Sequence, residues 1–474
     1  MDRDNPTASR VIAILTFGSL FPLLFFRLTE PQGAIFWFYS VSMTGFIILT
    51  YIMTKDYVPK PDVGYRPEVT VIIPAKDEEE AIGETVACVF RADYPASKLE
   101  VIAIDDGSAD QTWDRLQNVR NRLSVGDRLT LIRNATNEGK RAAMAAGIRR
   151  AKGEILVCID SDSFVDKDAI KLLVQPFTDP TVVGVCGHGE AANTDKGVLP
   201  KLQHYWYQVM FRIFKGMESR FANVTCCSGL LSAYRRNTVL AVLDDWLNQT
   251  FMGRPMLIGD DRELTNLVLK GTNGGFIRSH DEGRLIPVLP LSTREAKVVY
   301  QSNAVARTIV PTNFQGFLRQ QLRWKRSHIH GCINASKFMW RKPLRAAFSF
   351  YLYQFLVYMS TIVSVIWLIV RPLQGDALSG PVFLAGNMYV AFLSGLNVWK
   401  LSRAPKEAIL YTMGFVFISV FLSLTVLIYG WLTPWKGGWI TRPTTHQLDA
   451  QGKLLNEPMP LVRTHLSGES NSPS

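Results

Sequence analysis

The sequence predicts an α/β fold, in which a mixed, mostly parallel sheet is flanked by transmembrane and interfacial helices. Two observations support this prediction. Between Glu68 and Asp160, short runs rich in Val and Ile alternate with longer runs of helical character, as in proteins whose parallel strands are connected by helices. Long hydrophobic stretches stand before and after this region, and about 20 apolar residues are enough to span a bilayer.

The composition agrees with a soluble region joined to membrane segments. Of 474 residues, 47% are hydrophobic and 20% are charged, with a formal net charge of +11. A basic chain can bind nucleic acid, anionic lipid or a polyanion. Much of the excess lies beside hydrophobic runs, which favours the positive-inside bias of a membrane protein. We therefore expect the lipid bilayer as a partner and no nucleic acid. The six cysteines show no CxxC spacing, which favours free thiols over a zinc site.

Residues 1–55 are predicted to form a transmembrane hairpin. Two apolar runs, Val11 to Phe26 and Ala34 to Met53, are separated by Pro31-Gln32-Gly33. No small-residue cleavage site closes the first run, so we do not interpret it as a cleaved signal peptide. Basic residues follow the second run, and by the positive-inside rule this side of the hairpin should be cytosolic.

Residues 56–310 are predicted to be a cytosolic domain of alternating strands and helices. Ligands of such sheets bind beyond the carboxyl ends of the strands, and two acidic clusters stand at such ends here. The predicted strands are 69–74, 100–104, 129–133 and 155–159, and the predicted helices are 78–92, 111–123 and 140–151.

Amphipathic and hydrophobic segments follow. Residues 199–217 and 312–339 combine aromatic rings with Lys and Arg, which is typical of interfacial helices, and we assign 311–345 to an interfacial region. Residues 346–442 are predicted to be a second transmembrane region, followed by a disordered tail over 443–474. The candidate spans are 348–370, 382–399 and 408–432; the middle one is weak because it contains Gly and Asn, so the side of the C-terminus stays open.

Two acidic motifs directly follow predicted strands. Asp105 and Asp106 could bind a ribose or a uracil edge, or they could form a plain turn with a helix cap. Asp160 and Asp162 are two residues apart, so both carboxylates could hold one Mg²⁺ or Mn²⁺ and, through it, diphosphate oxygens. The alternative for this second pair is a solvated acidic loop.

Two further motifs lie later in the chain. Asp260 and Asp261 begin a helical stretch, where a carboxylate can be a helix cap or a general base that deprotonates an attacking hydroxyl. In the string Gln-Gln-Leu-Arg-Trp-Lys-Arg-Ser, Arg323 could clamp a diphosphate. Trp324 could stack on a sugar ring, and Gln320 could donate hydrogen bonds to either group. The alternative is the Trp and Arg belt of an interfacial helix.

These four motifs, in this order, resemble those of inverting family-2 glycosyltransferases. The last matches the QxxRW signature of the processive membrane members, which are the cellulose, chitin and hyaluronan synthases and the nodulation-type chitooligosaccharide synthases. Finer strings are most similar to the hyaluronan and nodulation-type enzymes. These strings are Gly259-Asp260-Asp261-Arg262, where cellulose synthases have TED, then Cys226-Cys227-Ser228-Gly229 before Tyr234-Arg235-Arg236, and Gly139-Lys140-Arg141.

The resemblance implies a GT-A-like fold for nucleotide-sugar transfer and a role for each matched residue. Asp105 and Asp106 would contact the uridine, and Asp160 and Asp162 would serve the metal and the diphosphate. Asp261 would be the catalytic base, with Asp260 as the alternative. The remaining matches would hold the diphosphate, the acceptor or the nucleotide: Gln320, Arg323, Trp324, Lys140 and Arg141.

The implied enzyme is a UDP-sugar-dependent hexosyltransferase, multi-pass in the plasma membrane with a cytosolic catalytic domain. It would polymerise UDP-GlcNAc, with UDP-GlcA as a candidate second donor, and pass the growing polysaccharide through its own channel. Two departures leave the polymer open: the stretch from Lys270 to Phe317 is longer than expected for hyaluronan synthases, and Ile440 replaces Gly in a WGTR-like string. The alternatives are a chitin or chitooligosaccharide synthase using UDP-GlcNAc alone, a non-catalytic membrane export subunit and a single-transfer lipid-phosphate glycosyltransferase.

Overall fold

The computed structural model describes residues 34–55, 57–278, 285–402 and 405–436. These residues belong to one of the two compact units of the chain, Met1–Trp439. Three sequence predictions fall outside the described residues: the first hairpin helix, the WGTR-like string and the C-terminal tail.

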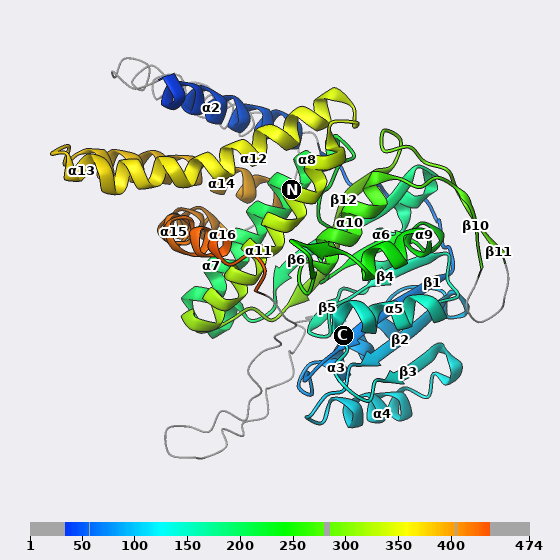
Figure 1. The fold of residues 1–474 in the computed structure, drawn as a ribbon. Helices are drawn as coiled ribbons and strands as arrows, with labels where there is room; N and C mark the ends of the chain where they lie inside the picture. The colour runs from blue at the N-terminus through cyan, green and yellow to red at the C-terminus, as the bar shows by residue number, and fades with distance from the viewer. Residues whose placement is uncertain (1–33, 56, 279–284, 403–404, 437–474) are drawn as a thin grey trace, which may run out of the picture. The chain divides into compact units, whose positions relative to one another are not determined.

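A mixed eight-stranded sheet forms the centre of the predicted cytosolic domain (Figure 1). Its order is β3-β2-β1-β4-β7-β6-β12-β5. All neighbouring strands are parallel except at β7, which is antiparallel to β4 and β6, and at β5, which is antiparallel to β12. The predicted class is therefore confirmed. The strands are β1 Val69–Ala75, β2 Leu99–Asp105, β3 Leu129–Arg133, β4 Ile155–Cys158, β5 Ser163–Val165, β6 Val182–Ala191, β7 Ser232–Arg235 and β12 Lys297–Thr308.

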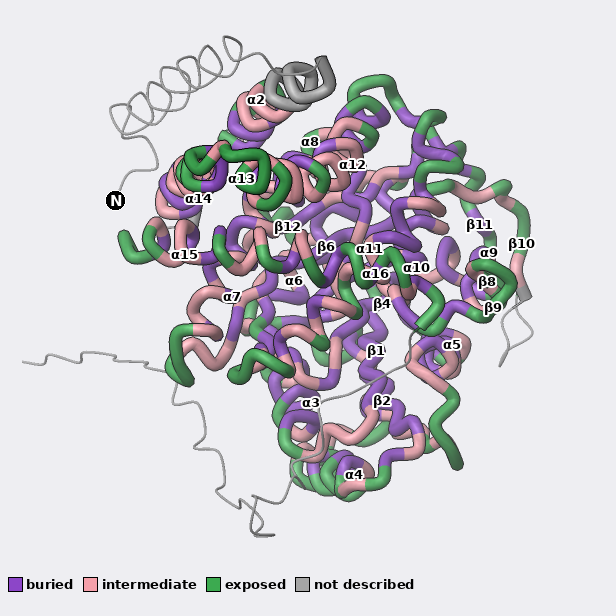
Figure 2. The backbone as a smooth tube through the Cα atoms, turned by 60° about the vertical axis from the view of Figure 1, so that its left-hand side comes forward, coloured by how far each residue is buried: buried purple, intermediate pink, exposed green. Residues whose placement is uncertain are grey.

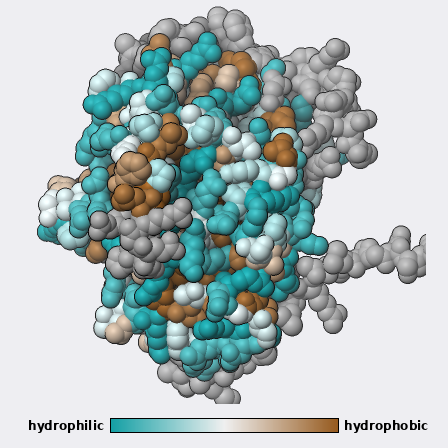
Figure 3. All heavy atoms as spheres, turned by 90° about the vertical axis from the view of Figure 1, so that its right-hand side faces the viewer, coloured by the Kyte–Doolittle hydropathy of each residue, from teal (hydrophilic) through white to brown (hydrophobic). Residues whose placement is uncertain are grey.

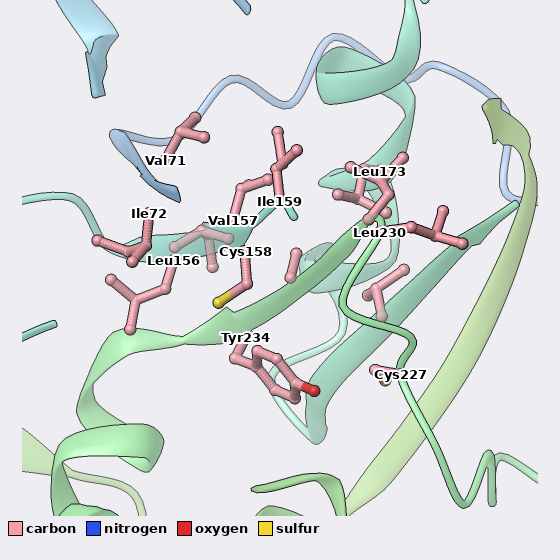
Figure 4. Packing of buried hydrophobic residues seen from close by; sticks show 14 of the residues in the cluster. Val71, Ile72, Leu156, Val157, Cys158, Ile159, Leu173, Cys227, Leu230 and Tyr234 are labelled. Atoms are coloured by element: carbon pink, nitrogen blue, oxygen red, sulfur yellow. The ribbon is translucent and has the colours of Figure 1, made fainter. Parts of the chain in front are cut away.

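The core lies along the central strands (Figure 2). Every residue of β1 and β4 is buried, because parallel strands covered on both faces are continuous apolar runs. Helices α3 Ile82–Phe90, α4 Thr112–Leu123 and α5 Lys140–Arg150 connect the first four strands. All three predicted helices are therefore present, but α3 begins four residues later than predicted. Figure 4 shows the side chains of Cys158 from β4 and Tyr234 from β7 close to each other in this core.

Two predicted amphipathic segments are helical. The first consists of α7 Val198–Gln208, a π-helical segment Val209–Lys215 and α8 Gly216–Arg220; the second is α11 Phe314–Met339. Helix α7 packs against β6 on one side and against α15 Glu407–Leu422 on the other. The Trp206 and Phe415 rings stack with their centroids 4.5 Å apart. The first segment thus joins the sheet to the hydrophobic helices, while its predicted interfacial position stays a prediction.

Among the described residues, three helical stretches are long and apolar enough to cross a membrane: Leu344–Leu373, Ser379–Leu401 and Glu407–Leu432. The middle stretch, which the sequence left uncertain, lies in one continuous helix, α14 Ser379–Ser402. The second helix of the predicted hairpin is α2 Ala34–Lys55, which contacts α12 Leu344–Val365. Figure 1 shows α2, α12 and α14 on the same side of the sheet.

The long stretch after Lys270 contains a hairpin of β10 Gly275–Arg278 and β11 Leu285–Val288. It packs against α9 Arg236–Leu247, where the Asn237 side-chain amide donates a hydrogen bond to the Pro287 carbonyl at 3.0 Å. The face of the molecule in Figure 3 is mainly hydrophilic, with small separate hydrophobic patches. Such a surface is typical of a region in contact with water.

Candidate functional site

A small pocket at the carboxyl end of β4 brings two of the four motifs together with Lys140. Its wall includes Lys140 from the start of α5, Asp160 from the loop after β4 and Asp261 from the start of α10 Asp260–Lys270. Parallel strands and the helix starts that follow them meet at one edge of a sheet, which explains why Lys140 and Asp160 lie together. Helix α10 follows the separate hairpin of β8 Thr250–Phe251 and β9 Arg254–Pro255, and it brings Asp261 to the same place. The apolar floor includes Cys158 and Tyr234.

Asp160 is partly exposed and pairs with Lys140 in this pocket. Its Oδ1 lies 2.5 Å from the Lys140 ammonium nitrogen, and its side chain is 33% exposed. The Asp160 N–H donates to the Gly229 carbonyl at 2.9 Å. A Cβ on Gly229 would lie 2.8 Å from Asp160 Oδ1, so only glycine leaves this carboxylate its present position.

The donor set around Asp160 fits a divalent cation shared with a substrate. Asp162 follows two residues later and is partly buried. Within the described ranges, no group of three or more His, Cys, Asp or Glu side chains could hold a metal ion. Two carboxylates with further oxygens from phosphate and water are the usual arrangement for Mg²⁺ at a nucleotide site. The protein residues therefore fit such an ion without providing a complete cage.

Lys140 stays protonated at this position. Burial works against its charge, but Asp160, Asp260 and Asp261 outweigh burial and raise the pKa of Lys140 above its usual value. An ammonium group thus stands between the two acidic motifs, where a diphosphate would otherwise meet only negative charge.

Asp105 and Asp106 are fully buried, and Asp106 holds the chain that leads into α5. Asp106 accepts hydrogen bonds from the Asn134 side-chain amide at 2.7 Å and from the N–H groups of Glu138 and Gly139 at 3.0 and 2.8 Å. Asp105 accepts one from the Ser108 N–H at 3.0 Å. The sequence did not indicate that Asp106 positions the 134–139 loop. Asp106 follows β2, whereas this loop follows β3, so the two are distant in sequence. Contact with uridine stays a prediction.

The acidic doublet divides into two different environments. Asp261 lines the pocket; its Oδ1 accepts a hydrogen bond from the Arg262 N–H at 2.8 Å, and its Oδ2 lies 3.6 Å from the Cys226 sulfur. Asp260 is not among the pocket-lining residues, and its Oδ1 accepts a hydrogen bond from Arg141 at 2.7 Å. Arg141 is 7% exposed and is likewise absent from the pocket wall.

Helix α11 brings the QxxRW residues close to α10. Asn266 of α10 donates a hydrogen bond to the Gly331 carbonyl at 3.0 Å, and a Cβ on Gly259 would lie 2.8 Å from the Ser327 hydroxyl oxygen. Gln320 is partly buried, Arg323 is exposed, and Trp324 is 37% exposed. None of these three lines the pocket around Asp160.

Tyr207 of α7 lies between α11 and the Asp160-Ser161-Asp162 motif. Its ring lies 6.0 Å, between centroids, from the Trp324 ring. Burial raises the pKa of Tyr207, with further increases from Asp162 and Asp160 and an opposing effect of Arg323. These charges therefore lie around the same hydroxyl. Nothing in the sequence distinguishes Tyr207, since one Tyr in an aromatic helix has no pattern of its own.

A second pocket lies beside Cys226. Its wall combines aromatic rings such as Phe214, Phe350 and Tyr353 with the polar side chains of Lys215 and Arg262. These residues come from the π-helical segment 209–215, α10 and α12. Cys226 lines this pocket and also contacts Asp261, which lines the first pocket.

Comparisons with known proteins find glycosyltransferases among the relatives of this chain. The sequence pattern of the family "Glycosyl transferase family 2" matches residues 70–242. Hyaluronan synthase of Streptococcus pyogenes serotype M3 is 28% identical over 446 residues, covering 92% of this chain and 98% of that protein. An N-acetylglucosaminyltransferase of Azorhizobium caulinodans is 34% identical over 262 residues, covering 55% of this chain and 59% of that protein. A solved mannosyltransferase of Pyrobaculum calidifontis, in complex with GDP-Man and Mn²⁺, has 18% identity, covers 87% of this chain and 99% of its own, and gives a TM-score of 0.49.

Proposed function

Since this chain is a family 2 glycosyltransferase related to hyaluronan synthase, we propose that it polymerises UDP-sugars into a hyaluronan-like polysaccharide that contains N-acetylglucosamine. The meeting of Lys140, Asp160 and Asp261 in one pocket carries the proposal. It provides a cation and a carboxylate suited to a nucleoside diphosphate beside a second carboxylate suited to base catalysis.

The proposed reaction is a single inverting displacement. The Asp261 carboxylate takes the proton of the acceptor hydroxyl, whose oxygen forms a bond to the anomeric carbon of the donor sugar. The bond from that carbon to the diphosphate oxygen breaks, and its electron pair leaves with UDP. Base catalysis of this kind contributes about 10²- to 10⁴-fold. Asp260 is engaged by Arg141, which favours Asp261 as the base.

Positive charge is needed where UDP departs. A bound Mg²⁺ or Mn²⁺ at Asp160 and Asp162 would neutralise the diphosphate. Lys140 lies beside Asp160, and we propose that its ammonium supports the same group. Arg323 is exposed and free to clamp the diphosphate with its planar fork. We assign Gln320 and Trp324 to the acceptor end of the chain, and Asp105 and Asp106 to the uridine side.

We further propose a multi-pass plasma-membrane protein with its catalytic domain in the cytosol and a channel for the growing polysaccharide. The second pocket supports this, because its wall includes Cys226, which contacts Asp261, and residues from the first turns of α12. This helix belongs to a stretch long and apolar enough to cross a membrane. Aromatic rings in its wall suit the apolar faces of sugar rings.

A second candidate is a chitooligosaccharide synthase. It is supported by the N-acetylglucosaminyltransferase relative, whose identity to this chain is higher than that of hyaluronan synthase but covers fewer residues.

In the experiment that tests both candidates, the purified full-length chain is given radiolabelled UDP-GlcNAc with or without UDP-GlcA, in the presence of Mg²⁺ or Mn²⁺. The products are then digested with hyaluronidase or chitinase. A hyaluronidase-sensitive polymer that needs both donors supports the proposal. A chitinase-sensitive product from UDP-GlcNAc alone supports the second candidate, and no UDP release from any donor overturns both.

A further inference from the structure

Arg141 stands in the first turn of α5 and is almost fully buried. Its Nε donates to Asp260 Oδ1 at 2.7 Å, across 119 positions of sequence. The Asp260 side chain is 16% exposed. A buried ion pair of this kind is costly to break, because removing one partner leaves an uncompensated charge inside the protein.

The same guanidinium binds three more acceptors, in two further stretches of the chain. One terminal nitrogen donates to the Trp246 carbonyl at 2.8 Å and to Gln249 Oε1 at 3.1 Å, and the other donates to the Ile258 carbonyl at 3.3 Å. The guanidinium carbon lies 5.6 Å from the centre of the Trp246 ring. Trp246 is fully buried, and its indole N–H donates to the Asp260 carbonyl at 3.1 Å. Arg141 therefore ties α5 to the end of α9 and to the start of α10.

The segment that Arg141 holds is fixed on its other side by α11. Gly259 has φ of +77° and lies so close to Ser327 that a Cβ would be 2.8 Å from the hydroxyl oxygen. Residues 258–260 are thus held between Arg141 and α11, and Asp261 follows directly. A shift of this segment would move the Asp261 carboxylate relative to the pocket.

We propose that Arg141 is a positioning residue that acts through Asp260 to hold Asp261 toward the pocket, and that it does not contact the nucleotide. This inference rests on the proposed function, in which Asp261 is the base. It reassigns Arg141 from the ligand-binding role implied by the family resemblance. Lys140, the preceding residue, points to Asp160 and keeps its proposed place beside the diphosphate.

The test uses Arg141→Lys and Asp260→Asn in the purified full-length chain, with UDP release as the rate and UDP binding measured separately. Lysine keeps the charge but cannot reach all four acceptors. We expect kcat to fall about 10- to 100-fold in each variant, since a displacement near 1 Å can cost that much. The KM for UDP-GlcNAc and the Kd for UDP should change less than about twofold, because the ligand contacts remain. The double variant should be no slower than the slower single variant.

Arg149→Gln is the matched control. Arg149 lies on the same helix and pairs with Asp244 of α9 at 3.4 Å, on the exposed surface. It should keep the wild-type rate. An unchanged kcat in Arg141→Lys would overturn the inference. If the KM also rose or UDP binding weakened, Arg141 would be a ligand-binding residue. If Arg141→Lys does not fold, the kcat of Asp260→Asn decides the question. Its unfolding temperature, compared with that of the wild type, shows whether this variant is folded. This inference alone would be refuted if Asp261→Asn lost UDP release while the Arg141 and Asp260 variants kept normal rates. The proposed function would be refuted if the wild-type chain released no UDP.

Discussion

The ammonium nitrogen of Lys140 lies 2.5 Å from Oδ1 of Asp160. This contact joins the first turn of α5 to the loop after β4 and places a fixed positive charge on the proposed metal-binding carboxylate. The same ammonium interacts with Asp260 and Asp261. One side chain therefore balances charge across both acidic motifs of the pocket.

Lys140→Gln should change cation and donor binding in opposite directions. Without the ammonium, Asp160 is free for a metal ion, so the Mn²⁺ concentration for half-maximal binding should fall several-fold. The KM for the UDP-sugar should rise about tenfold, because a charged hydrogen bond to the diphosphate is lost. Electron paramagnetic resonance of Mn²⁺ and initial rates measure the two effects. The control is Lys152→Gln, at an exposed lysine just after α5, which should leave both values unchanged. Weaker Mn²⁺ binding in Lys140→Gln would contradict a competition between the ammonium and the metal ion for Asp160.

Asp261→Asn should lower kcat for UDP release by about 10²- to 10⁴-fold, the usual contribution of a general base. Asn keeps the size of the side chain and its hydrogen bond to the Arg262 N–H, so UDP binding should persist. Equilibrium binding of UDP and initial rates check this separately. A variant that keeps more than about a third of the wild-type rate would show that another group takes the proton.

Gly229→Ala should disturb the proposed metal-binding motif without unfolding the sheet. The added Cβ would lie 2.8 Å from Asp160 Oδ1, so the carboxylate must move away. We expect Mn²⁺ affinity to fall about tenfold, with UDP release falling in parallel. Gly83→Ala is the control, because its Cβ would meet no atom within 4 Å. Wild-type Mn²⁺ affinity in Gly229→Ala would mean that Asp160 is not a ligand.

Trp324→Ala should shorten the polymer more than it slows the first transfer. The ring is 37% exposed beside Tyr207 and is proposed to stack on the acceptor, so its removal should speed product release. Gel electrophoresis of the polymer and the KM for the UDP-sugar test this; the KM should change less than about twofold. Trp340→Ala removes a more exposed indole just after the same helix and should give wild-type length.

Acid should destabilise the domain through His188. Burial lowers the pKa of His188 from 6.5 to about 4, and its Nδ1 is hydrogen-bonded to the Tyr300 hydroxyl at 2.7 Å. As the pH falls, His188 is protonated in the unfolded chain before it is protonated in the folded chain. The free energy of unfolding therefore falls as the pH drops from 6.5 toward 4, and below about 4 it falls no further through this group. The loss is on the order of 3 kcal/mol. Thermal unfolding of His188→Gln should show a weaker dependence over this range, and an unchanged slope would assign the loss to other groups.

Much of the cytosolic domain could be predicted because its signals are local. The apolar runs of β1 and β4 identify buried strands, and the acidic residues after β2 and β4 identify strand ends. The α14 stretch was harder, because internal Gly and Asn weaken the apolar signal while the helix still forms. The roles of Tyr207 and Trp246 could not be read from the sequence, since an aromatic residue in an amphipathic helix has the same pattern whether it packs in a core or beside a site.

The sequence by itself determined the α/β class, the order of the four motifs and the chemistry of their side chains, because strand periodicity and residue type are local properties. Only the tertiary structure decided that Asp261 faces the pocket while Asp260 pairs with Arg141. It likewise decided that Lys140 and Arg141, adjacent in the chain, serve different acidic motifs. The physical reason is that these contacts join residues on different elements, whose relative positions follow from packing of the whole sheet and its helices.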